Sequence, residues 1–131
     1  MGTAVLKTLE LLERRKTLYK ELGIDYYQPW IVLMTDGRPT DDITKAVRKV
    51  RELISQRRLV VFPIAIGPYA DMDSLSLFTI PGIPPPPLKL KGLKFKEFFI
   101  WLSKSVAQVS RSVPGMLYEL LLDDVEDWSE L

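Results

Sequence analysis

The sequence predicts an α/β fold: a three-layer, Rossmann-like arrangement in which helices flank a mainly parallel sheet. Two apolar runs, residues 30–35 and 59–66, have the length of strands, and continuous apolar strands are typical of parallel sheets covered on both faces. The segment between them has apolar residues at helical spacing, which predicts a crossover helix. A strand, a helix and a strand in this order form a right-handed βαβ unit.

Composition narrows the possible functions. The 131 residues, 47% of them hydrophobic, fit one globular domain spanning residues 1–131. The net charge of +1 gives no electrostatic argument for binding nucleic acid or anionic membranes. Cysteine and histidine are absent, which excludes disulfides, Cys/His zinc sites, thiol nucleophiles and a Ser-His-Asp triad within this chain. A bound metal must therefore be a hard cation held by oxygens.

The chain shows no targeting signal. No apolar stretch is long enough to span a bilayer, and we expect no signal peptide. A cytoplasmic location is therefore expected.

The first half of the chain predicts two amphipathic helices. Residues 4–22 form the first, and Gly23 is its expected C-cap. The second begins near Pro39 and Thr40, with two acidic residues in its first turn, where they complement the helix dipole. These residues are Asp41 and Asp42.

The second half predicts shorter elements. Asp71 and Asp73 can cap a short helix, and the prolines at 84–87 predict an extended spacer or, alternatively, a recognition segment. Residues 88–91 can form a short edge strand, and residues 116–122 a strand or a helix. A helix is expected over residues 94–111, with these residues on one side: Phe95, Phe98, Phe99, Leu102, Val106 and Val109. The acidic end frays unless Trp128 docks.

The most informative motif follows the first predicted strand. Residues 35–41 read Thr-Asp-Gly-Arg-Pro-Thr-Asp, which places Asp36 at the carboxyl end of a parallel strand, where open α/β sheets bind ligands. The alternative is a turn-forming Asp that caps Gly37. Thr3 is likewise open to two interpretations, as a ligand or as the N-cap of the first helix.

Several stretches resemble the von Willebrand factor A-type (vWA) domain. Residues 2–4 (Gly-Thr-Ala) resemble its second metal-binding loop, residues 35–41 its third, and residues 62–67 the strand that follows. Residues 90–95, 98–103 and 110–112 resemble a bacterial and phage subgroup associated with tellurium resistance and stress operons.

The resemblance implies a Mg²⁺ or Mn²⁺ ion at the carboxyl edge of the sheet. By position, Thr3 would be the ligand from the second loop and Asp36 the ligand from the third. The family's Asp-x-Ser-x-Ser loop does not occur in this chain, so the resemblance implies a truncated domain with an incomplete metal site. An ion held by few carboxylates accepts one from a partner protein, which makes binding metal-dependent.

These observations favour a non-enzymatic protein–protein interaction module of a stress-response or tellurium-resistance-like system. Without the family's first strand, residues 30–35 are an exposed apolar edge, so we expect self-association through this strand or assembly with a chain that supplies the missing half. One alternative is a Mg²⁺-dependent phosphoryl-transfer or hydrolytic enzyme that uses Asp36. A second alternative is a fragment of a longer vWA protein.

Overall fold

The computed structural model describes residues 1–25, 28–109 and 128–130. It confirms a mixed α/β fold in which helices flank a small parallel sheet. The elements in chain order are α1 (Gly2–Glu21), β1 (Trp30–Thr35), α2 (Thr44–Ser55), β2 (Val60–Ala65), α3 (Met72–Ser76), β3 (Leu88–Leu90), α4 (Phe95–Val109) and β4 (Ser129–Glu130).

The sheet has the strand order β1-β2-β3-β4. Strands β1, β2 and β3 are parallel, and β4 runs antiparallel to β3. The ladder between β1 and β2 runs from the pair Trp30 and Val60 to the pair Thr35 and Ala65, as the βαβ prediction requires. Because β4 pairs with β3, the expectation that residues 88–91 form an edge strand was wrong.

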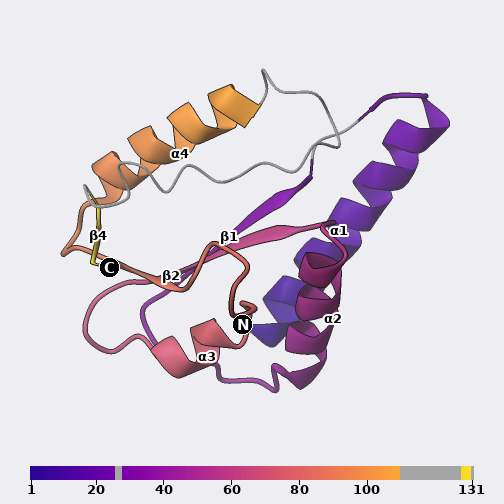
Figure 1. The fold of residues 1–131 in the computed structure, drawn as a ribbon. Coiled ribbons are helices and arrows are strands. Elements are labelled where there is room, and N and C mark those ends of the chain that lie inside the picture. Colours follow the sequence, from indigo (N-terminus) through magenta and orange to yellow (C-terminus); the bar gives the residue numbers. More distant parts are fainter. Residues whose placement is uncertain (26–27, 110–127, 131) are drawn as a thin grey trace.

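Helices cover both faces of the sheet (Figure 1), with α1, α2 and α3 on one side and α4 on the other. Along β2, Val61 packs with the residues of α1 and α2, whereas Phe62 packs with those of α4. This alternation is the two-residue period of a strand covered on both faces. It also explains why the strands read as continuous apolar runs.

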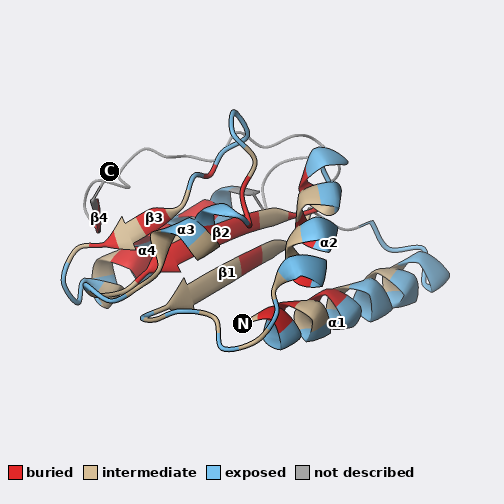
Figure 2. Ribbon diagram, turned by 90° about the horizontal axis from the view of Figure 1, so that it is seen from below, coloured by how far each residue is buried: buried red, intermediate tan, exposed pale blue. Residues whose placement is uncertain are grey.

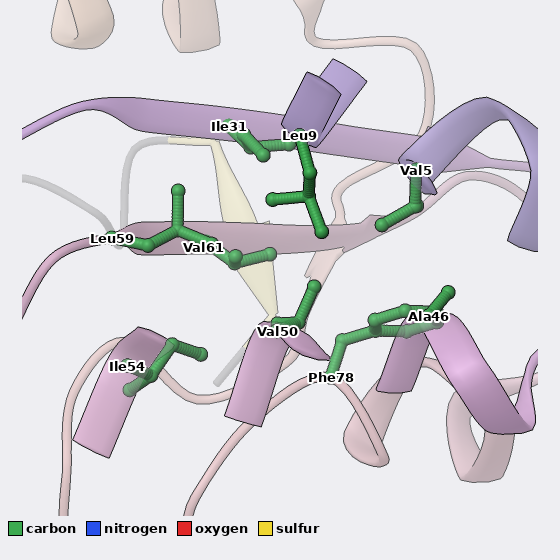
Figure 3. Packing of buried hydrophobic residues seen from close by; sticks show 9 residues of the cluster. All are labelled: Val5, Leu9, Ile31, Ala46, Val50, Ile54, Leu59, Val61 and Phe78. Carbon is green, nitrogen blue, oxygen red and sulfur yellow. The ribbon is translucent and has the colours of Figure 1, made fainter. Parts of the chain in front are cut away.

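One apolar core lies between the sheet and helices α1 and α2 (Figure 3). Leu9 of α1 and Val50 of α2 point toward Ile31 and Val61 of the strands. The cluster consists of Val5, Leu9, Ile31, Ala46, Val50, Ile54, Leu59, Val61 and Phe78. The buried residues of α1 are Gly2, Val5 and Leu9, and Leu12 packs partly buried beside them, so this helix is anchored in the core mainly through its N-terminal part.

The second core is aromatic and lies under α4. The rings of Phe62 and Trp101 are 5.5 Å apart, and those of Phe98 and Trp128 are 4.8 Å apart. Trp128 is fully buried, so it docks in this core. The adjacent strand β4 pairs with β3 and joins the sheet. The expected elements within residues 110–127 lie outside the described residues.

The face that α4 buries differs in part from the expected one: Phe95, Phe98 and Leu102 pack in the core as expected, but two other residues do not. Phe99 and Val106 are 52% and 47% exposed, whereas Trp101 and Ser105 are buried. The contact face follows positions 98, 101 and 105, the i, i+3 and i+7 spacing of a helix. Ser105 concealed this face in the sequence because it is polar; its hydroxyl donates to the carbonyl of Trp101 at 2.9 Å.

Helix α1 ends where the sequence predicted, whereas α2 begins later than expected. Gly23 has a φ of 67° immediately after α1, and its N–H donates to the carbonyl of Lys20, which confirms it as the residue that terminates this helix. Helix α2 begins at Thr44 rather than near Pro39 and Thr40. Asp42 Oδ1 accepts the N–H of Thr44 at 2.9 Å, and Asp41 is engaged elsewhere.

Candidate functional site at the carboxyl end of β1

Asp36 follows the last residue of β1 and is exposed. The turn beyond it is held by its neighbours, because Thr35 Oγ1 accepts the N–H of Gly37 at 3.3 Å. The Gly37 carbonyl accepts the N–H of Asp71 at 3.1 Å, which ties this loop to the loop after β2. Thus Thr35, and not Asp36, caps the turn, which leaves the Asp36 carboxylate directed to solvent without a hydrogen-bond partner among the described residues.

Asp41 joins this loop to the start of α1. Its carboxylate accepts the N–H groups of Gly2 at 3.0 Å and Thr3 at 2.8 Å, and the amino group of Met1 at 3.1 Å. The first turn of a helix has N–H groups without partners inside the helix, and a carboxylate satisfies them and complements the dipole. The expectation that Asp41 lies in the first turn of α2 was therefore wrong: it caps α1.

These contacts determine the protonation of Asp41. Hydrogen bonds from the backbone of Thr3, then of Gly2, hold the pKa of the Asp41 carboxyl far below its usual value. The amino terminus and the Thr3 side chain act in the same direction. Asp41 is therefore a carboxylate at neutral pH, with its lone pairs committed to α1.

Thr3 lies in the first turn of α1 and is exposed. Its expected role as N-cap was wrong, because the cap position is Met1 and the capping carboxylate comes from Asp41. The contact with Asp41 nevertheless brings Thr3 to the loop that carries Asp36. In Figure 2 this loop, between β1 and α2, passes beside the start of α1.

Gly2 makes this contact possible. A Cβ atom on Gly2 would lie 2.5 Å from the carbonyl oxygen of Asp42 and 3.2 Å from the Cα of Ile43. Backbone atoms cannot yield as a flexible side chain can, so any larger residue would push α1 away from the loop. The Gly-Thr pair at the start of the chain thus has a packing role, besides the ligand role that the sequence suggested for Thr3.

The other acidic residues near this edge have local structural roles. Asp71 Oδ2 accepts the hydroxyl of Ser74 at 2.7 Å, and this bond lowers the pKa of the Asp71 carboxyl. Hydrogen bonds from Thr44 likewise lower the pKa of Asp42. Both carboxylates therefore accept hydrogen bonds from residues two or three positions further along the chain, at the starts of α3 and α2.

The oxygen donors at this end fit a divalent cation only in part. Across the described ranges, no group of three or more Asp or Glu side chains is arranged to hold a metal. Asp36 offers one carboxylate and Thr3 one neutral hydroxyl, while Asp41 is committed to α1. Such a donor set suits Mg²⁺ or Mn²⁺ only if water or another chain supplies most of the ligands.

Comparison with known proteins adds no relative. No protein-family model, no curated protein and no solved structure matches the chain. Within the described residues, no helix is long and apolar enough to cross a membrane. The resemblance to vWA domains therefore rests on the sequence motifs alone.

Proposed function

We propose that this chain is a non-enzymatic interaction module of the vWA type that binds a protein partner at the carboxyl end of β1. The observation that carries the proposal is the junction made by Asp41. By capping α1, Asp41 places Thr3 beside the loop of Asp36, and these two residues are the ones that the family resemblance assigns to the metal.

The chemistry of this pair suits recognition of an acidic side chain. A Mg²⁺ or Mn²⁺ ion held by the Asp36 carboxylate and the Thr3 hydroxyl retains net positive charge, so it attracts a carboxylate from another protein. The backbone N–H of Thr3 donates to Asp41 at 2.8 Å, so the contact that fixes this turn does not need the Thr3 hydroxyl, which can serve as an oxygen ligand.

The open edge of β1 is the second part of the proposed interface. The carbonyls of Pro29 and Thr35 accept N–H groups from β2, so by alternation the backbone groups of Val32 and Met34 point away from β2. In the described part of the chain no strand pairs with that side of β1. An unpaired edge of this kind can add a strand from a partner or from another copy of the chain.

Isothermal titration calorimetry with MgCl₂ and MnCl₂ tests the metal site. We expect weak binding to the wild-type chain, loss of binding in Asp36→Ala and reduced affinity in Thr3→Val. Asp73→Ala, which removes an exposed carboxylate from α3, is the matched control and should bind as the wild type does. Equal binding by wild type and Asp36→Ala would overturn the proposed site. Phosphate-ester turnover that depends on Asp36 would instead favour the enzymatic alternative.

A further inference from the structure

Helix α1 and its C-cap residue carry an apolar line that the core does not use. Leu11, Leu18 and Leu22 are 57%, 42% and 63% exposed. Their spacing of seven and four residues places them on one side of the helix. The residues that α1 turns to the core, Val5, Leu9 and Leu12, lie on a different side. The line of leucines is therefore a separate surface.

The position of α1 makes this surface accessible. Figure 2 shows α1 on the outer side of β1, with its second half extending beyond the end of α2. Helix α1 therefore lies at the margin of the domain, where a second copy can reach it. We propose that the line Leu11-Leu18-Leu22 is the seam of a homodimer in which α1 packs antiparallel against α1 of a second copy.

The leucine spacing matches an antiparallel pair of identical helices. When Leu11 of one helix lies opposite Leu22 of the other, Leu18 lies opposite Arg15. The alkyl stem of Arg15 can cover Leu18 while its charged end stays in water. The Arg15 guanidinium already lies over the Tyr19 ring, 6.0 Å from its centroid, so it is held along the helix surface. The seam repeats around a two-fold axis, which closes the assembly at two copies.

The charges beside the seam favour the same orientation. Arg14 and Glu21 lie on one flank of the leucine line, and in the antiparallel pair Arg14 of each copy reaches Glu21 of the other. In a parallel pair this flank of one copy lies on the opposite side of the dimer from the same flank of the other copy, so Arg14 and Glu21 do not meet. Arg14 also binds Glu10 at 2.7 Å on an exposed surface. Because exposed ion pairs contribute little energy, these charges select the orientation more than the affinity.

The size of the seam sets the strength of the dimer. Stable complexes bury about 1,200–2,000 Å² of surface in total. Three leucines from each helix bury less surface than this. The dimer is therefore reversible, and its population rises with protein concentration. This self-association is independent of the metal site and of the β1 edge.

Sedimentation equilibrium over roughly 10 µM to 1 mM, the range of weak complexes, tests the seam. The mass of the wild-type chain should rise from 15.0 kDa toward twice that value. Leu18→Glu should remain monomeric throughout. Leu77→Glu, which alters a leucine of similar exposure (44%) after α3, should dimerise as the wild type does. A monomeric wild type at the highest concentration, or a dimeric Leu18→Glu, would overturn the proposal.

Charge reversal tests the orientation. Arg14→Glu and Glu21→Arg should each weaken dimerisation about tenfold, because each places like charges across the seam. The double variant should recover wild-type dimerisation, since it exchanges the two partners. Circular dichroism must show the same helix content in each variant. Failure of the double variant to recover would refute the antiparallel pairing.

Discussion

Phe98 and Phe99 are adjacent residues of α4 with opposite environments, so they test how this helix packs. Phe98 is fully buried, with its ring 4.8 Å from that of Trp128 and 6.0 Å from that of Trp101. Phe99 is 52% exposed. Truncating a buried Phe to Ala costs about 3–5 kcal/mol. Because three aromatic contacts of about 0.5–1.5 kcal/mol each, with Phe99, Trp101 and Trp128, are lost as well, we expect Phe98→Ala to fall in the upper part of that range.

For a domain of this size, 1 kcal/mol corresponds to roughly 3–5 °C in Tm, so a loss of about 4–5 kcal/mol in Phe98→Ala should lower the Tm by about 12–25 °C. Phe99→Ala should lose about 1 kcal/mol, since its ring contacts that of Phe98 at 5.2 Å but stays largely in water. Thermal unfolding and urea titration give both values. If Phe98→Ala does not fold, Phe98→Leu, with a loss of about 1.5 kcal/mol, preserves the comparison. Equal losses in the two alanine variants, or a larger loss in Phe99→Ala, would refute this packing of α4.

Three further changes test the junction and the docked end. Asp41→Asn should lower the Tm at neutral pH. Because folding lowers the Asp41 pKa, the stabilisation that the carboxylate contributes is full above about pH 4 and is lost as the pH falls. A Tm difference between variant and wild type that does not depend on pH would contradict this. Gly2→Ala should lower the free energy of unfolding by about 1–3 kcal/mol, because its Cβ would meet backbone atoms. Gly37→Ala, which has open space around its Cβ, is the control and should change the Tm little. Equal Tm changes in the two variants would refute the close approach at Gly2. Trp128→Ala should cost about 3–5 kcal/mol and remove a buried fluorophore, and an unchanged Tm would mean that this end does not support the sheet.

The periodicity of the sequence was sufficient to predict the βαβ unit. The apolar runs around Ile31 and Val61 identified strands covered on both faces, and Gly23 marked the end of α1. These features are local, because each depends on residues that are close in the sequence. The buried face of α4 was misjudged for the same reason: Phe99 is apolar and Ser105 is polar, and only packing against the sheet reveals which of the two is buried.

The junction at the candidate site could not be predicted from local patterns. Asp41 and Thr3 are 38 residues apart in the sequence, and they meet only after α1 packs against α2 and the sheet. The nearest sequence signal was the Gly-Thr pair at positions 2 and 3, whose small residue permits the close approach. The motif at residues 35–41 correctly placed Asp36 after a parallel strand, but it gave Asp41 to the wrong helix.

The most direct test of the proposed site is paramagnetic broadening of backbone amide signals by Mn²⁺, recorded on the full chain by NMR. Mn²⁺ should first broaden the signals of Thr3, Asp36 and Gly37, and Asp36→Ala should abolish this selective broadening. The acidic residues of α1, including Glu10 and Glu13, should be unaffected at the same Mn²⁺ concentration. If broadening centres on those glutamates, or persists unchanged in Asp36→Ala, then the carboxyl end of β1 is not a metal-dependent interaction site.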